Sequence, residues 1–197
     1  MNYLAHLMLA DDSDASRIGN LLGDFTKGTL TSLAEVYPAE IIRGIKMHRA
    51  VDRFTDSHQV FKNARALLAP ERRRFSGIII DIIFDHYLSI HWDDYHHQPL
   101  EYFINDVYRA LDEHPEWRAG RLAHAFPMMR HENWLITYAT IEGVELTLER
   151  VSRRGKRTGQ IADGIIDLRK HYAEFEASFQ AFMPSLLDFT DTWKSKH

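Results

Sequence analysis

The chain has 197 residues, of which 45% are hydrophobic and 26% charged, a balance that excludes a disordered, collagen-like or coiled-coil chain. It has no cysteine, which excludes disulfides, thiolate zinc sites and thiol nucleophiles. A net charge of −4 argues against general nucleic-acid binding, while the unusually many histidines, 12 in all, point to proton chemistry or to a metal held by nitrogen and oxygen ligands.

Helical periodicity and capping residues predict an all-α protein that forms one compact multi-helix domain over residues 1–197. The isoleucines at 78–83 favour a strand by propensity, but the length of segment 70–92 and the helical spacing of Asp81 and Asp85 favour a helix. No Asn-Gly hairpin or sustained polar–apolar alternation is present. The seven or eight expected helices cover residues 3–10, 14–25, 39–56, 70–92, 100–114, 116–130, 132–151 and 160–189, with a polar loop at 27–32.

Two further segments bear on location and on flexibility. The apolar start of the chain lacks a basic region, and the longest apolar run, residues 77–84, is too short to cross a bilayer and contains Asp81. We therefore expect a cytoplasmic protein with no membrane contact. The basic segment 150–157 is the one plausible hinge, and a seam within a single domain is the preferred interpretation.

Four clusters place ionisable or polar side chains inside apolar helical segments. Helical residues four apart project to the same side, and an unpaired carboxylate among isoleucines would cost several kcal/mol. The carboxylates outnumber the neighbouring Arg49 and Arg53, an imbalance that a divalent metal would correct. The clusters are His6; Asn20 with Asp24; His48 with Asp52 and Asp56; and Asp81 with Asp85 and His86.

Each cluster has a structural explanation when taken alone. His48 and Asp52, for example, are also the spacing of a helix-surface pair that contributes a few tenths of a kcal/mol. Because all four clusters fall within the first 92 residues, a metal or catalytic centre is the better interpretation.

Several common catalytic motifs are absent. The sequence has no P-loop, GxGxxG or GxSxG, which argues against the common nucleotide-binding folds and serine hydrolases, and HExxH is also absent. An oxygen and nitrogen site suits Mn²⁺, Mg²⁺ or Fe²⁺. Hydrolysis of a phosphoester is the chemistry that such a site favours.

Four ordered segments carry a family resemblance: MNYLAHLMLA (1–10), GNLLGDF (19–25), GIKMHRAVDRFTD (44–56) and DIIFDHYLSIHW (81–92). With these, and with a weaker likeness through residues 131–184, the chain resembles the bacterial acyl carrier protein phosphodiesterases, which are similar to the HD-domain metal phosphohydrolases. The resemblance implies an HD-like helical fold. It also implies hydrolysis of the phosphodiester between 4′-phosphopantetheine and a serine of acyl carrier protein, with a divalent metal, usually manganese, and with magnesium or iron as alternatives.

The resemblance also implies roles for individual residues. The implied metal ligands are Asp24, His48, Asp52, Asp85 and His86. Arg49, Asp56 and Asp81 would orient the substrate or the ligands, and His6 and Asn20 would line the pocket. A standard HD site has an adjacent His-Asp pair, whereas this chain has Asp85-His86 in the reverse order.

The implied partner is an acidic protein, so the docking surface should be basic. Two runs of basic residues fit: Arg72, Arg73 and Arg74; and Arg150, Arg153, Arg154, Lys156 and Arg157. Two alternatives stay open at this point. One is an HD-like phosphohydrolase that acts on nucleotides or another small phosphodiester, and the other is a non-catalytic helical module that binds an acidic protein.

Overall fold

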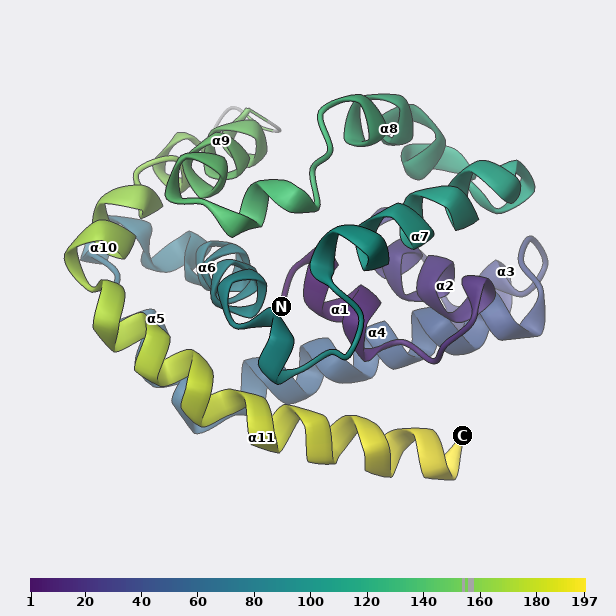
Figure 1. The fold of residues 1–197 in the computed structure, drawn as a ribbon, viewed down its shortest axis with the longest axis horizontal. Helices are drawn as coiled ribbons and strands as arrows, with labels where there is room; N and C mark the ends of the chain where they lie inside the picture. The colour runs from purple at the N-terminus through teal and green to yellow at the C-terminus, as the bar shows by residue number, and fades with distance from the viewer. Residues whose placement is uncertain (154, 156–157) are drawn as a thin grey trace.

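The computed structural model describes residues 1–153, 155 and 158–197, and every regular element in those residues is a helix. The all-α prediction is therefore confirmed. The described residues form eleven α-helices, joined in places by short 3₁₀ turns (Figure 1). The α-helices are α1 (Tyr3–Leu9), α2 (Asp14–Phe25), α3 (Leu30–Leu33), α4 (Ala39–Ser57), α5 (Gln59–Ala66), α6 (Ser76–Ile90), α7 (Leu100–Glu113), α8 (Gly120–His131), α9 (Ile141–Ser152), α10 (Gly164–Lys170) and α11 (Tyr172–Lys196).

The expected number of helices was wrong because short helices and sharp breaks leave little periodicity. Helix α3 has only four residues and forms in the expected polar loop, where the Thr29 hydroxyl accepts a hydrogen bond from the Ser32 amide. Helix α5 follows α4 after a single extended residue, His58. A break at His171 likewise divides the expected C-terminal helix into α10 and α11.

Helix α6 lies at the centre of the core. Its isoleucines at 79, 80, 82 and 83 are buried, as are Phe84, Tyr87 and Leu88. A helix that is apolar on nearly every side must be surrounded by other elements. Helices α1, α5, α9 and α11 all pack against α6, and Figure 1 shows α11 along one edge of the molecule.

Helices α2 and α4 form a close pair. A Cβ atom on Gly19 would lie 2.5 Å from the carbonyl oxygen of Ile41, and one on Gly44 would lie 2.8 Å from the Cα atom of Gly19. The two backbones can approach this closely only because both positions are glycine. The pair matters for the site described below, because α2 carries Asp24 and α4 carries His48 and Asp52.

Two expectations concern segments away from the core. Across the described residues, no helix has both the length and the apolar character needed to cross a bilayer. The predicted hinge at 150–157 includes residues 154, 156 and 157, which lie outside the described residues.

Candidate metal centre

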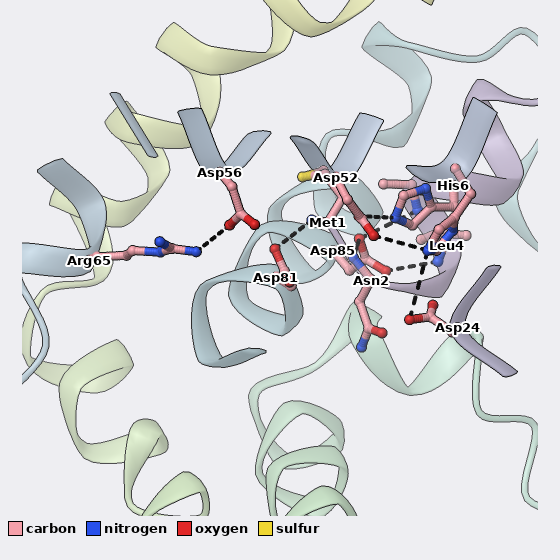
Figure 2. A network of polar contacts seen from close by, with 12 residues as sticks. Met1, Asn2, Leu4, His6, Asp24, Asp52, Asp56, Arg65, Asp81 and Asp85 are labelled. Carbon is pink, nitrogen blue, oxygen red and sulfur yellow. Dashed lines mark hydrogen bonds and ion pairs between the residues drawn. The ribbon is translucent and has the colours of Figure 1, made fainter. Parts of the chain in front are cut away.

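Three side chains from two helices lie close together, and Figure 2 labels two of them, His6 and Asp52. His6 comes from α1, whereas His48 and Asp52 stand one turn apart on α4. His6 Nε2 lies 3.1 Å from Asp52 Oδ1, and His48 Nε2 lies 3.1 Å from Asp52 Oδ2. One ligand atom from each residue lies within 4.8 Å of the others, so this metal group of His6, His48 and Asp52 could hold a metal ion.

The two imidazoles are buried without adequate hydrogen bonds. His6 and His48 are only 1% and 2% exposed, and their rings stack with centroids 3.8 Å apart. Neither nitrogen of His6 nor Nδ1 of His48 makes a hydrogen bond of acceptable geometry. Buried polar atoms normally have partners, and leaving them without one is costly. His6 Nε2, which makes no such hydrogen bond and lies 3.1 Å from Asp52 Oδ1, therefore fits a bound cation.

The charge states of the metal group also suit a cation. Burial and the neighbouring His48 lower the pKa of His6 to about 3, so His6 is neutral. Burial lowers the pKa of His48, but the Asp52 and Asp24 carboxylates outweigh burial and the net pKa is raised. Although burial alone would raise it, the pKa of Asp52 is lowered by the two histidines. Neutral imidazole and ionised carboxylate are the forms that bind metals, and at His48 a proton would compete with the ion.

A cavity of about 130 Å³ adjoins the metal group. Asp24 Oδ1 lies at its edge, 4.0 Å from His48 Nε2, and Asp81 Oδ1 accepts a 2.5 Å hydrogen bond from the Met1 ammonium. Burial raises the pKa of Asp81 to about 6 despite that ammonium. Four carboxylates thus face one small space. We call this cavity the aspartate pocket, and its lining residues are Met1, Asp24, Asp52, Thr55, Asp56 and Asp81.

The Asp85 carboxylate faces the first turn of α1. Asp85 is fully buried on α6, and its carboxylate accepts hydrogen bonds from the backbone N–H groups of Leu4 (2.8 Å) and Asn2 (3.1 Å) (Figure 2). Burial raises the pKa of Asp85 to about 7, although these bonds and the Met1 ammonium oppose the shift. Asp85 therefore caps the N-terminus of α1 and holds the helix that carries His6.

His86 is not brought to the metal group. Its Nδ1 lies 2.7 Å from the carbonyl oxygen of Tyr138, which can only accept, so Nδ1 carries the proton. Its Nε2 then accepts from the Tyr172 hydroxyl at 2.9 Å. Burial lowers the pKa of His86. Because both ring nitrogens are engaged, this geometry gives no support to His86 as a metal ligand.

Of the three remaining residues that the resemblance implies, Asp56 lines the aspartate pocket, whereas Asn20 and Arg49 do not. Asp56 lines the aspartate pocket and pairs with Arg65 at 2.5 Å. Asn20 is buried between α2 and α4, where Nδ2 donates to the Ser16 carbonyl, and it does not line the pocket. Arg49 follows His48 about 100° around α4 and is also absent from the pocket wall.

Two residues that the sequence analysis did not single out help to form the site. A Cβ atom on Gly23 would lie only 2.1 Å from Cγ of His48, so the missing side chain lets the imidazole lie against α2. Thr55 lines the aspartate pocket, three residues after Asp52 on the same side of α4. A signal for Gly23 is present in the sequence, because Gly19 and Gly23 stand four apart in a helix that also carries Asp24.

Comparisons with known proteins agree over nearly the whole chain. The model of the acyl carrier protein phosphodiesterase family matches residues 1–186. An acyl carrier protein phosphodiesterase of Photorhabdus laumondii is 35% identical over 189 residues, covering 95% of this chain and 94% of that protein. One of Pectobacterium atrosepticum is 34% identical and covers 98% of both chains. No solved structure matches significantly. The site therefore lies in a chain that belongs to the acyl carrier protein phosphodiesterase family.

Proposed function

We propose that this protein hydrolyses the phosphodiester between 4′-phosphopantetheine and a serine of acyl carrier protein, using a divalent metal held by the metal group. The observation that carries the proposal is the pair of buried imidazoles whose Nε2 atoms each lie 3.1 Å from an oxygen of Asp52, beside the aspartate pocket. Family membership supports the reaction and the carrier protein as the substrate.

His6, His48, Asp52 and Asp24 are the proposed holders of the metal. Two imidazoles and carboxylates suit a borderline cation, and manganese is the proposed ion. When bound, such an ion polarises a phosphoryl oxygen and lowers the pKa of a water ligand. The two-His, two-Asp donor set is also what supports a kinship with HD-domain phosphohydrolases.

The overall reaction is a displacement at phosphorus. A water oxygen forms a bond to phosphorus, and the bond from phosphorus to the serine oxygen breaks. The serine oxygen receives a proton, which leaves apo-carrier protein and free 4′-phosphopantetheine. Asp81 is the proposed group for exchanging a proton with a reacting oxygen, because its pKa near 6 suits transfer close to neutral pH.

The residues around the metal group orient the reactants. Asp85 fixes α1 and so holds the His6 imidazole in place. Asp56 and Arg65 form an ion pair at the rim of the aspartate pocket, where the guanidinium brings positive charge towards an entering phosphate.

The proposed docking surface for the acidic carrier is smaller than the two basic runs. Arg72 is largely buried, with Nε and Nη2 bound to Asp167 at 2.5 and 2.9 Å, so it is not available for docking. Arg150 pairs with Glu132 at 2.7 Å and lies over the Trp134 ring. The exposed Arg73, Arg74 and Arg153 remain candidates, whereas residues 154, 156 and 157 of the second run lie outside the described residues.

The test is an assay in which the protein is incubated with holo-carrier protein and the formation of apo-carrier protein is followed by intact mass. The protein is stripped with chelator and reloaded with Mn²⁺, Mg²⁺ or Fe²⁺. We expect activity only with metal, and we expect Asp52→Asn and His48→Ala to lower both metal content and turnover by orders of magnitude.

Matched controls are Asp93→Asn and His124→Ala, which alter exposed residues outside the aspartate pocket. Both should keep wild-type activity. Hydrolysis of nucleotides without release of phosphopantetheine would overturn the substrate assignment. Equal activity of the chelated and reloaded proteins would overturn the metal assignment.

A further inference from the structure

A second cavity continues from the aspartate pocket. Its volume is about 250 Å³, and it shares Met1, Asp24 and Asp81 with the aspartate pocket. Its other lining residues are four aliphatic side chains together with Asn2, Tyr3 and Thr158. We call this space the apolar cleft, and the aliphatic residues that line it are Ile78, Ile82, Val151 and Ile161.

The geometry of α6 sets the distance between the carboxylates of the aspartate pocket and the aliphatic side chains of the apolar cleft. Ile78 precedes Asp81 by three residues, so both lie on the same side of the helix, about 4.5 Å apart along its axis. The carboxylate end and the aliphatic end of the combined space are therefore one helical turn apart. A ligand that spans the aspartate pocket and the apolar cleft must have a charged centre joined directly to an apolar segment.

Ile78 itself is not needed for the core. It is 43% exposed, whereas the neighbouring Ile79 and Ile80 are fully buried. Because Ile78 lines the cleft and is not buried in the core, its side chain is available to contact a ligand there.

We propose that the apolar cleft receives the pantetheine arm and that Ile78 determines specificity for it. The carbon next to the phosphate ester in this arm is followed by a carbon that bears two methyl groups, so the part nearest the phosphate is apolar and branched. With the phosphate at the aspartate pocket, these methyl groups reach the isoleucines one turn away. This inference rests on the proposed function and extends it to the substrate's organic part.

The test fills the cleft at its exposed mouth. Ile78→Trp is compared with Ile90→Trp, which places the same residue at a similarly exposed position (41%) about 18 Å further along the same helix. We expect Ile78→Trp to raise the KM for holo-carrier protein about tenfold or more, the scale of one hydrophobic pocket contact. Turnover of methyl p-nitrophenyl phosphate, which lacks the arm, should stay unchanged, and Ile90→Trp should resemble wild type on both substrates.

A binding measurement on wild-type protein does not depend on catalysis or on a variant. Pantetheine, without phosphate, is titrated into metal-free protein while isoleucine methyl resonances are recorded. We expect shifts at Ile78 and Ile82 and none at Ile90.

The outcomes separate the two proposals. Equal KM values for the two tryptophan variants, or no shift at Ile82, would overturn the cleft assignment and leave the phosphodiesterase activity in place. If a folded Ile78→Trp protein lost activity on both substrates, the cleft assignment would also be overturned, because residue 78 would then affect the reacting centre. Failure of the wild-type protein to convert holo-carrier protein would instead overturn the proposed function.

Discussion

Gly23→Ala should disturb the candidate metal centre through a single methyl group. In the structure, a Cβ atom at this position would lie 2.1 Å from Cγ and 2.6 Å from Nδ1 of His48. Ordinary carbon contacts are about 3.5–4.0 Å, so the imidazole or the helix pair must move by more than about 1 Å. Movement of this size displaces a proposed metal ligand.

The net cost of Gly23→Ala follows from two opposing effects. Overpacking a core position costs about 1–3 kcal/mol, whereas replacing glycine by alanine inside a helix stabilises by about 0.5–1 kcal/mol. We expect a net destabilisation of about 1–2 kcal/mol, which corresponds to a Tm about 2–8 °C lower in a protein of this size. The affinity for Mn²⁺ should fall more steeply, by about 10–100-fold, because ligand orientation is lost.

Calorimetry gives the Mn²⁺ affinity, and a double-mutant cycle with His48→Ala isolates the contact. Once the imidazole is removed, Gly23→Ala should become neutral or stabilise the protein by about 0.5–1 kcal/mol. Gly19→Ala is the matched control, because its Cβ would meet the backbone of α4 and so lower stability without touching the imidazole. The reasoning is refuted if Gly23→Ala binds Mn²⁺ as wild type does, or if its cost is the same with and without the His48 ring.

Three further predictions concern residues around the site and the core. Asp85→Asn replaces one of the two acceptor oxygens with an amide donor that faces the N–H groups at the N-terminus of α1. The free energy of unfolding in urea should fall by about 1–3 kcal/mol, and Mn²⁺ should bind more weakly because α1 carries His6. Unchanged values of both quantities would contradict the capping role. Arg72→Met leaves the Asp167 carboxylate buried without its cation and should lower the free energy of unfolding by about 3–5 kcal/mol. The double variant Arg72→Met, Asp167→Leu should regain most of that stability. A double variant as unstable as the single one would contradict the prediction. The pKa of His86 is lower in the folded than in the unfolded protein, so its contribution to stability is complete above about pH 6.5 and is lost as the pH falls towards the folded pKa. The difference in unfolding free energy between wild type and His86→Gln should therefore shrink between about pH 7 and pH 5. A difference that stays constant over this range would refute the prediction.

Some of the site was predictable because it depends on local geometry. His48 and Asp52 lie four residues apart on a helix, and that spacing alone places them on one side. The excess of aspartates in apolar segments also indicated a cation site, because burying a carboxylate without a partner is costly. Asp24, Asp52, Asp56 and Asp81 do line one pocket.

Other features of the site could not be predicted from the sequence, because they depend on long-range packing. Asp85 and His86 are adjacent, yet one caps α1 and the other binds Tyr138 and Tyr172. Neighbouring residues on a helix point about 100° apart, so which of them faces a given partner is decided by the surrounding helices. Family resemblance placed both residues at the metal, and only the packing around α6 separates them.

The sequence by itself determined that the protein is helical, because apolar residues recur with the period of an α-helix from one end to the other. It also determined the His48–Asp52 pair, which needs only one turn of one helix. The tertiary structure alone decided that His6 joins this pair, since His6 lies on α1 and reaches Asp52 of α4 only through the packing of separate helices. Contacts between residues far apart in the chain depend on how whole helices pack, and no local spacing encodes that packing.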